Sequence, residues 1–192
     1  MLHRILKSVK EKFVSHSVSQ CNIRSLKEAD LVSIRQILYF WFVDFQLSIH
    51  NKSYLSLVQE YFKVIKQSLQ NDECHYFVAT HKNTVVGIFG YTSKMTSEVK
   101  ELYVQLKSKP LDSVVQARLL FVHHKYLRRG IGELLFYYVL REAHTNKNKE
   151  LLFTSTRKWD QTSWGFYDHL GLKHIYENEE GRVYYVNLEN FF

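Results

Sequence analysis

Two glycines that follow a basic turn are the residues of this chain best suited to bind a phosphate. Gly130 and Gly132 come directly after Arg128 and Arg129, and an amphipathic helical pattern begins at Ile131. The first backbone N–H groups of a helix lack intrahelical acceptors and lie at the positive end of the helix dipole, so they bind anions. Glycine carries no side chain that would hold the anion away. The pattern therefore predicts that a pyrophosphate binds at this helix start.

Two other phosphate-binding motifs do not fit this segment. A P-loop requires Gly-x-x-x-x-Gly-Lys-Ser/Thr, and no such string occurs in the sequence. A dinucleotide fingerprint requires a third small residue where Leu135 stands. It also requires an acid near the end of the next strand, whereas Glu150 stands at the start of that strand. Neither motif describes this turn.

The segment from Val122 to Glu133, VHHKYLRRGIGE, resembles the coenzyme A motif of the GNAT superfamily of N-acetyltransferases. That motif reads Arg/Gln-x-x-Gly-x-Gly/Ala, and Leu127 stands at its first position. The family's phosphate contacts come mostly from main-chain amides, so this departure concerns one side-chain contact. The resemblance implies that the chain binds acetyl-CoA as its cosubstrate. The implied pyrophosphate-binding residues are Arg128, Arg129, Gly130, Ile131, Gly132 and Glu133.

A second stretch, DQTSWGFYDHLGL, resembles another signature of the same family, Asn-x-x-Ala-x-x-aromatic-Tyr followed by Gly-Phe. Tyr167 matches the tyrosine, and Gly171-Leu172 matches the Gly-Phe pair. Asp160 replaces the Asn and Ser163 replaces the Ala. The resemblance implies that Asp160 and Ser163 lie on the cofactor side of the site. It makes Tyr167 the candidate general acid, because a phenol is a suitable proton donor for a departing thiolate.

The family resemblance also gives a role to the strand before the glycine turn. The main chain of Leu120, Phe121 and Val122 would line the pantetheine arm, and a backbone N–H there would polarise the acetyl carbonyl. A thioester needs no covalent enzyme intermediate when an amine is held against its carbonyl. Neither cysteine lies in the motif region, which agrees with direct transfer.

The base that takes the proton of the acceptor amine is left open. Many relatives carry a Glu near the start of this strand, but here the matching region is Gln116-Ala-Arg118. His123 follows the strand and titrates in a useful range, although a His there often serves turn geometry in the family. Glu98, Glu101 and an ordered water chain are the alternatives.

The acceptor is expected to be a primary amine of a small molecule or of a protein or peptide. In the family, the two helices after the first strand and the last hairpin loop shape the acceptor pocket. Those segments here contain the aromatic run Phe40-Trp41-Phe42, then Phe45 and His50, and later residues 176–182. Core packing is the alternative explanation for these aromatics. The positive charge of the chain argues against a polycationic acceptor such as a polyamine.

The elements that position these residues alternate between strand and helix patterns. Residues 97–107 fit neither pattern clearly. Expected strands are residues 21–24, 76–79, 84–89, 111–122, 151–155, 172–176 and 183–188. Expected helices are residues 28–44, after a capping box of Ser25 and Glu28, then 53–70, 130–144 and 161–170. We therefore expect an α/β fold with a GNAT-like mixed sheet of about six to seven strands flanked by helices, with a right-handed crossover over residues 117–155. The resemblance implies a splay between the two central parallel strands.

Length and composition favour one domain. We expect residues 21–192 of this 192-residue chain to form a single acetyltransferase domain. Residues 1–20 read as a basic amphipathic segment that could cap the domain, lie on a membrane surface or target an organelle. The longest apolar run, residues 37–43, is far below the ~20 residues of a membrane span, so none is expected.

Charge and cysteine content limit the partners. The net charge of +7 favours an anionic partner, which a polyphosphate cofactor satisfies. No nucleic-acid-binding motif occurs, so a nucleic-acid-binding domain is the weaker alternative, beside a catalytically silent GNAT-like domain. Cys21 and Cys74 match no metal or redox spacing, and we expect a cytoplasmic monomer or homodimer without a metal. A disulfide between the two cysteines stays open.

Overall fold

The structure is a computed structural model that describes residues 20–44, 53–71, 73–106, 110–157, 161–172, 174–179 and 181–190. The predictions made for residues 1–19, Phe45, His50 and Asp160 lie outside this part of the chain, as does the side chain of Glu98. The division into an N-terminal segment and one domain stays a prediction.

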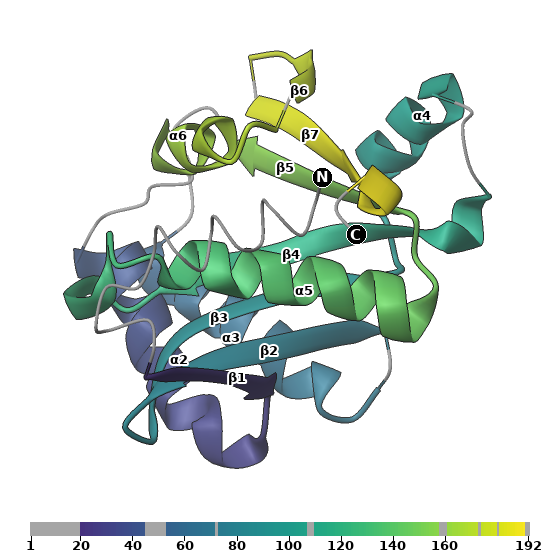
Figure 1. The fold of residues 1–192 in the computed structure, drawn as a ribbon. Helices are drawn as coiled ribbons and strands as arrows, with labels where there is room; N and C mark the ends of the chain where they lie inside the picture. The colour runs from purple at the N-terminus through teal and green to yellow at the C-terminus, as the bar shows by residue number, and fades with distance from the viewer. Residues whose placement is uncertain are drawn as a thin grey trace.

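A seven-stranded mixed sheet forms the centre of the molecule (Figure 1). Its strand order is β1-β2-β3-β4-β5-β7-β6, and β4 with β5 is the one parallel pair among the described strands. This agrees with the fold class expected from the sequence. The strands are β1 (Cys21–Ser25), β2 (Cys74–His81), β3 (Thr84–Thr92), β4 (Val114–Val122), β5 (Leu151–Arg157), β6 (His174–Glu177) and β7 (Gly181–Asn187).

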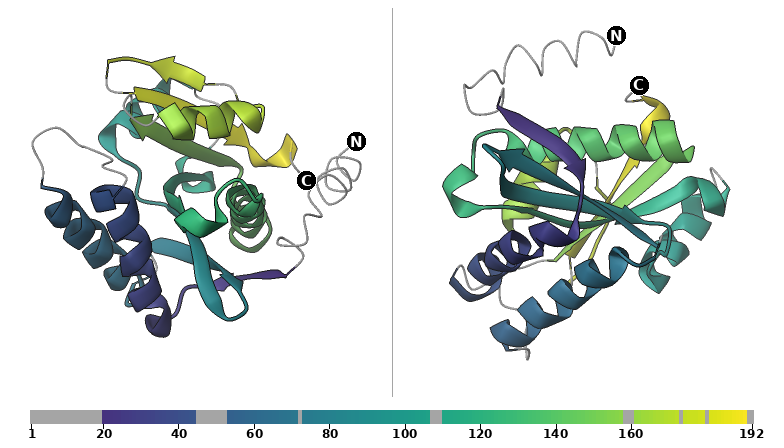
Figure 2. Two further views of the ribbon diagram at one scale, coloured as in Figure 1. Left: turned by 90° about the vertical axis from the view of Figure 1, so that its left-hand side faces the viewer. Right: turned by 90° about the horizontal axis from the view of Figure 1, so that it is seen from below.

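Helices cover both faces of the sheet, as the two views of Figure 2 show. One face carries α2 (Leu31–Tyr39), α3 (Tyr54–Ser68) and α4 (Ser97–Leu106). The other face carries α5 (Ile131–Lys147) and α6 (Gln161–His169). The segment that fitted neither pattern is thus α4. The strand expected from residue 111 begins instead at Val114, because Leu111–Ser113 form a 3-10 turn.

Separate apolar clusters hold the helices to the sheet. The residues of α5 that are almost completely buried recur at helical spacing, as the sequence predicts, and burial of each large side chain contributes about 1.5–3 kcal/mol. They are Ile131, Leu135, Phe136, Val139, Leu140 and Ala143. On the opposite face, α2 and α3 pack Ile34, Ile37, Leu38, Leu57 and Ile65 against Val78 and Ile88.

The predicted capping box of Ser25 and Glu28 is wrong. Ser25 belongs to β1, and the cap forms two residues later, where the buried Asp30 carboxylate accepts a hydrogen bond of 2.8 Å from the backbone N–H of Lys27. Asp30 also receives two hydrogen bonds from Arg24, at 2.7 and 2.8 Å. The strand extends too far for the predicted cap, since the N–H of Leu26 still donates to β2.

Candidate active site

The parallel pairing of β4 and β5 is short. It comprises Val114 with Leu151, Val115 with Leu152 and Gln116 with Phe153. Both strands continue beyond these pairs, and the residues that follow from each strand line a common pocket. The splay expected between the strands stays a prediction in itself. What the structure shows is that the pocket lies where their pairing has ended.

A β-bulge lies in β4 beside this pocket. Phe121 pairs with Ile88 and Arg118 pairs with Gly90, so Leu119 and Leu120 stand opposite the single residue Phe89. Leu119 has a φ of +52°, which is rare for a residue with a large side chain. Such strain is kept where the surrounding structure requires it, often at functional sites. The bulge re-aims the β4 main chain at the edge of the pocket.

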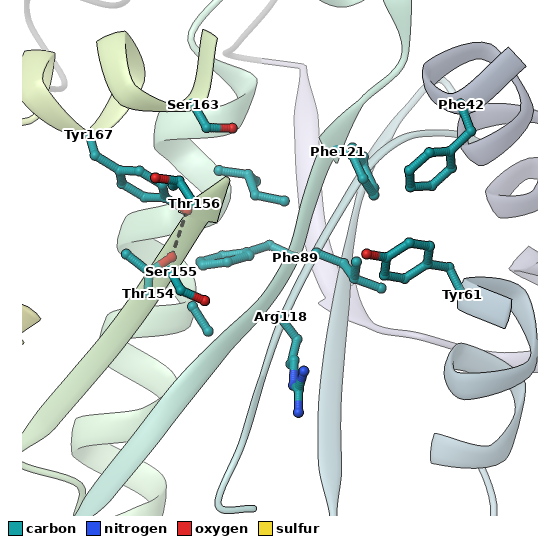
Figure 3. A pocket seen from close by; sticks show the side chains of 13 residues that line it. Phe42, Tyr61, Phe89, Arg118, Phe121, Thr154, Ser155, Thr156, Ser163 and Tyr167 are labelled. Atoms are coloured by element: carbon teal, nitrogen blue, oxygen red, sulfur yellow. Dashed lines mark hydrogen bonds between the residues drawn. The ribbon is translucent and has the colours of Figure 1, made fainter. Parts of the chain in front are cut away.

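The pocket joins side chains from both faces of the sheet. Its volume is about 140 Å³. Figure 3 shows Tyr167, Ser163 and Thr154 from α6 and β5 on one side, and Phe42 and Tyr61 from the helices of the opposite face on the other. β4 runs between them and adds Ala117, Arg118, Leu119, Leu120 and Phe121. Of the strand residues predicted to line the cofactor arm, Leu120 and Phe121 thus lie at the pocket.

Tyr167 is held firmly at the pocket. Its side chain is buried, and its ring packs against Phe136, Phe166 and Tyr184. The hydroxyl of Thr154 donates a hydrogen bond of 3.1 Å to the phenol oxygen. A phenol that accepts a hydrogen bond at its oxygen can still donate its own proton. The structure therefore brings Tyr167 and Ser163 into the same pocket as the bulged strand.

The turn between β4 and α5 presents backbone donors. Gly130 caps α5 with a φ of +79°, and Arg128 before it has a φ of +57°. The first turn of α5 closes with the N–H of Leu134 on the carbonyl of Gly130, at 2.9 Å. The N–H groups of Ile131, Gly132 and Glu133 precede this bond and so have no acceptor within the helix. A left-handed residue at a helix start groups such donors into an anion-binding nest.

Gly132 brings this turn close to α6 and β4. A Cβ atom on Gly132 would lie 3.4 Å from Cε2 of Phe166 and 3.8 Å from a methyl of Val122. These are ordinary contact distances, and the φ of Gly132 is not positive. Gly132 therefore lies within ordinary contact distance of α6 and β4. The N–H groups that have no acceptor within the helix, beside Arg128 and Arg129, are compatible with the diphosphate that the sequence predicts here.

The charged residues of the turn differ in their suitability for an anion. Arg129 lies over the ring of Tyr126, at 5.4 Å from its centroid, and Arg128 is exposed. Glu133 is half-buried, and burial raises the pKa of its carboxyl, although His169 acts in the opposite direction. A carboxylate side chain would repel a phosphate. The contribution expected from Glu133 is therefore its main-chain N–H alone.

His123 serves the geometry of the turn. Its Nδ1 accepts a hydrogen bond of 3.3 Å from the backbone N–H of Lys125. Its backbone N–H donates to the carbonyl of Val86. Its ring stacks on His124, at 4.4 Å between centroids. Burial lowers the pKa of His123, and the neighbouring His124 and Lys125 lower it further. Among the described residues, those that line the pocket do not include His123.

Sequence reasoning missed two residues that shape this site. Thr154 carried no signal, because its role depends on its pairing in space with Tyr167. The sequence places Trp41 only in an aromatic run of the acceptor pocket or the core, yet its indole N–H donates a buried hydrogen bond of 2.9 Å to the carbonyl of Val122. This bond ties the π-helical turn Phe40–Asp44 to the end of β4.

The fold defines a class of protein, the coenzyme A-dependent acetyltransferases. The chain belongs to the acetyltransferase (GNAT) family, whose model matches residues 35–172, well over half of the chain. It is an acetyl-CoA-dependent acetyltransferase with acetyl-CoA as its cosubstrate. No curated protein gives a significant sequence match.

Solved structures show the same fold at low sequence identity. PaiA N-acetyltransferase from Thermoplasma acidophilum, in complex with coenzyme A, has a TM-score of 0.67 at 14% identity over 87% of this chain and 98% of that chain. A GNAT acetyltransferase from Staphylococcus aureus has a TM-score of 0.64 at 16% identity over 88% and 99%. A mutant of SpeG spermidine N-acetyltransferase from Vibrio cholerae has a TM-score of 0.63 at 12% identity over 90% and 96%.

No helix in the described part of the chain combines the length and the apolar character needed to cross a membrane.

Both cysteines are thiols: Cys21 lies on β1 opposite His81, and Cys74 lies on β2 opposite Thr92. The two side chains therefore occupy opposite ends of β2, so the disulfide left open by the sequence is not formed.

Proposed function

We propose that the protein transfers the acetyl group of acetyl-CoA directly to a primary amine. The observation that carries this proposal is the shared pocket of Tyr167 and the bulged strand β4, next to the donors at the start of α5. The pocket thus joins a fixed phenol to a re-aimed main chain, and the turn that would bind the pyrophosphate follows the end of the same strand. Direct transfer needs these three parts and no nucleophilic side chain.

The turn at the start of α5 would hold the pyrophosphate of the cosubstrate. The backbone N–H groups of Gly130, Ile131, Gly132 and Glu133 would donate, with positive charge from Arg128 and Arg129 beside them. Ser163 would contact the same molecule on the pocket side. Val122 would add its main chain at the end of β4. The role predicted for Asp160 stays a prediction.

Bound acetyl-CoA supplies an acetyl group already activated as a thioester. The main chain of Leu120, which lies in the bulge, or of Phe121 next to it, would donate to the acetyl oxygen as negative charge develops on it. The amine nitrogen forms its bond to the acetyl carbon, and the carbon–sulfur bond breaks. Tyr167 would then give its proton to the departing sulfur, while Thr154 stabilises the phenolate oxygen that is left.

No side-chain base is included in the proposal. The described residues that line the pocket include no acid and no histidine. Glu101 is exposed on α4, and Nδ1 of His123 is occupied by the turn. The acceptor would therefore react as the neutral amine and lose one proton to water as the amide forms. The Tyr167 phenolate would regain its proton from water. The cytoplasmic location and the monomeric or dimeric state expected from the sequence stay predictions.

Amine-dependent release of thiol from acetyl-CoA tests the proposal. The purified full chain is incubated with acetyl-CoA and a panel of small amines and short peptides, and each product is identified by its mass. We expect thiol release in step with an acetylated amine for at least one class of acceptor. Acetyl-CoA binding without thiol release from any acceptor would instead support the catalytically silent alternative.

A further inference from the structure

A second hollow adjoins the pocket on the face of the sheet that carries α3 and α4. Its volume is about 230 Å³, and it shares Tyr61, Arg118 and Ser155 with the first pocket. Thr96, at the entry to α4, and Gly181 with Arg182, at the start of β7, complete the far wall. Because Tyr167 lies in the first pocket and not in the second, the second hollow extends away from the proposed acid.

Arg118 lies at the junction of the two hollows. It pairs with Gly90 across the sheet, and Gly90 in turn pairs with Tyr76, whose ring belongs to the α2–α3 side of the core. Directly opposed residues in a sheet share a face, so Arg118 also faces that side. Figure 3 shows its side chain extending away from Tyr167. The guanidinium therefore faces the side opposite to the α5 turn.

Within the described part of the chain, no carboxylate lies within ion-pair distance of Arg118. The contrast with Arg182 is clear. Arg182 donates to Glu177 at 2.7 Å and lies 3.4 Å from a carboxylate oxygen of Asp168, so its charge is balanced. Arg118 is half-buried as a residue, and its guanidinium keeps donors that a bound anion could accept.

The other polar groups of the second hollow are donors or can act as donors. The side-chain oxygen of Gln116 accepts a hydrogen bond of 2.9 Å from the N–H of Thr96, so the polar atoms left on Gln116 are its NH₂ donors. Ser155 adds a hydroxyl group, whereas the hydroxyl of Thr156 donates to the carbonyl of Arg182 at 3.4 Å. No acid belongs to this lining among the described residues. Such a lining suits a carboxylate and opposes a polycation.

On the basis of the proposed function, we infer that the acceptor is a small amine that carries a carboxylate, such as an amino acid, and that Arg118 binds this carboxylate. A guanidinium and a carboxylate match in a planar, two-bond geometry, which makes the contact specific as well as strong. The amine would then lie on the pocket side of the carboxylate, toward the acetyl group. This separates the chain from its structural neighbours described as spermidine N-acetyltransferases.

The test compares matched acceptors. Thiol release is measured with the L-amino acids, with their primary carboxamides and with spermidine, for the unchanged chain and for Arg118→Gln. We expect kcat/KM for the preferred amino acids to exceed that of their carboxamides by about tenfold or more, which corresponds to one lost charge-assisted contact. Arg118→Gln should remove this preference and leave the affinity for acetyl-CoA unchanged. Arg141→Gln, on the outer side of α5, is the matched control and should keep the preference.

Calorimetry adds a readout that is independent of turnover. The CoA-saturated chain should bind the preferred amino acid, and Arg118→Gln should bind it at least about tenfold more weakly. Equal or better use of carboxamides or of spermidine, or a preference that survives Arg118→Gln, would overturn the inference while leaving the proposed function intact. Release of no thiol with any acceptor would count against the proposed function instead, and carboxylate binding in calorimetry would still decide the role of Arg118.

Discussion

The hydroxyl of Thr154 donates to the phenol oxygen of Tyr167 at 3.1 Å, and this bond joins β5 to α6 at the wall of the pocket. It fixes the direction from which the Tyr167 oxygen can face a ligand. A donor on a phenol oxygen also favours the phenolate that remains after proton transfer. The pair therefore positions the acid and eases the loss of its proton.

Removal of the acid should slow the reaction and spare cofactor binding. Tyr167→Phe keeps the ring and its packing but removes the proton donor, so we expect kcat to fall by about 100-fold. The acetyl-CoA affinity should stay within about twofold of the unchanged chain, because only the oxygen is lost. Thr154→Val, which keeps the shape of the side chain, should lower kcat by a smaller factor, about three- to tenfold.

Two further variants control for this interpretation. Thr154→Ser keeps the hydroxyl and should restore most of kcat. Tyr185→Phe changes an exposed tyrosine and should have no effect. If acetyl transfer limits kcat and kcat is unaltered in Tyr167→Phe, this residue is not the acid of the reaction.

The pH dependence of kcat/KM should follow the acceptor and not the enzyme. Because no acid or histidine among the described residues lines the pocket, only the neutral amine reacts, and the rate should rise with pH up to the pKa of that amine. Two acceptors whose amine pKa values differ should give inflections that differ by the same amount. His123→Asn, which can still accept from the turn, should leave both profiles unchanged. An inflection that disappears in His123→Asn would identify this ring as the base.

The ion pair of Arg24 and Asp30 should make stability depend on pH. The hydrogen bond from Arg24, aided by the N–H of Lys27, holds the pKa of Asp30 below its usual value. A lowered folded-state pKa contributes stability above the unfolded pKa of about 3.9, and this contribution is lost as pH falls through the folded pKa.

Asp30→Asn should therefore cost about 1–3 kcal/mol in the free energy of unfolding near pH 7, measured with urea. The difference from the unchanged chain should shrink as pH falls below about 4. Glu28→Gln, an exposed residue of the same turn, should change little at either pH. A cost for Asp30→Asn that stays constant down to low pH would contradict the ionic origin of the effect.

Two glycines should respond oppositely to alanine. A Cβ on Gly90 would lie 2.4 Å from a ring carbon of Tyr76 and 2.6 Å from the carbonyl oxygen of His75, so the sheet must shift at the strand that faces Arg118. Gly90→Ala should lower the free energy of unfolding by about 1–3 kcal/mol. Gly165 lies in α6 with no atom near its Cβ position, and Gly165→Ala should raise stability by about 0.5–1 kcal/mol. Equal changes in stability for Gly90→Ala and Gly165→Ala, measured by thermal unfolding, would contradict the crowding described at Gly90 and the open space at Gly165.

Most of the fold could be predicted because its elements carry strong local patterns. The helix that begins at Ile131 is predicted by the spacing of its apolar residues and by the glycines before it. The strands are predicted by their apolar runs and by the turn residues between them. α4 was ambiguous because its buried apolar residues, such as Val99 and Leu102, span about one turn, and the apolar Val104 lies on its exposed side. The capping box failed because tertiary pairing extends the chain beyond Ser25 and leaves the cap to Asp30.

The candidate site was predictable where the family resemblance names a residue, as for Tyr167, or where main-chain geometry follows from residue type. Gly130 with its positive φ is such a case. The strained Leu119 was invisible, since nothing local requires a bulge at a leucine. From the sequence, Arg118 shows only that the Glu of many relatives is absent from this segment. Its proposed role as a carboxylate ligand depends on the residues that surround it in the second hollow.

The binding of acetyl-CoA to variants of Gly130 tests the account most directly. Gly130→Asp places a negative charge at the turn, while Gly130→Asn has the same size and tolerates the same left-handed backbone, so their difference isolates charge. Calorimetry should show affinity reduced by about tenfold or more in Gly130→Asp relative to Gly130→Asn. Equal affinity for the unchanged chain and both variants would show that the start of α5 does not hold the diphosphate, and would contradict the account.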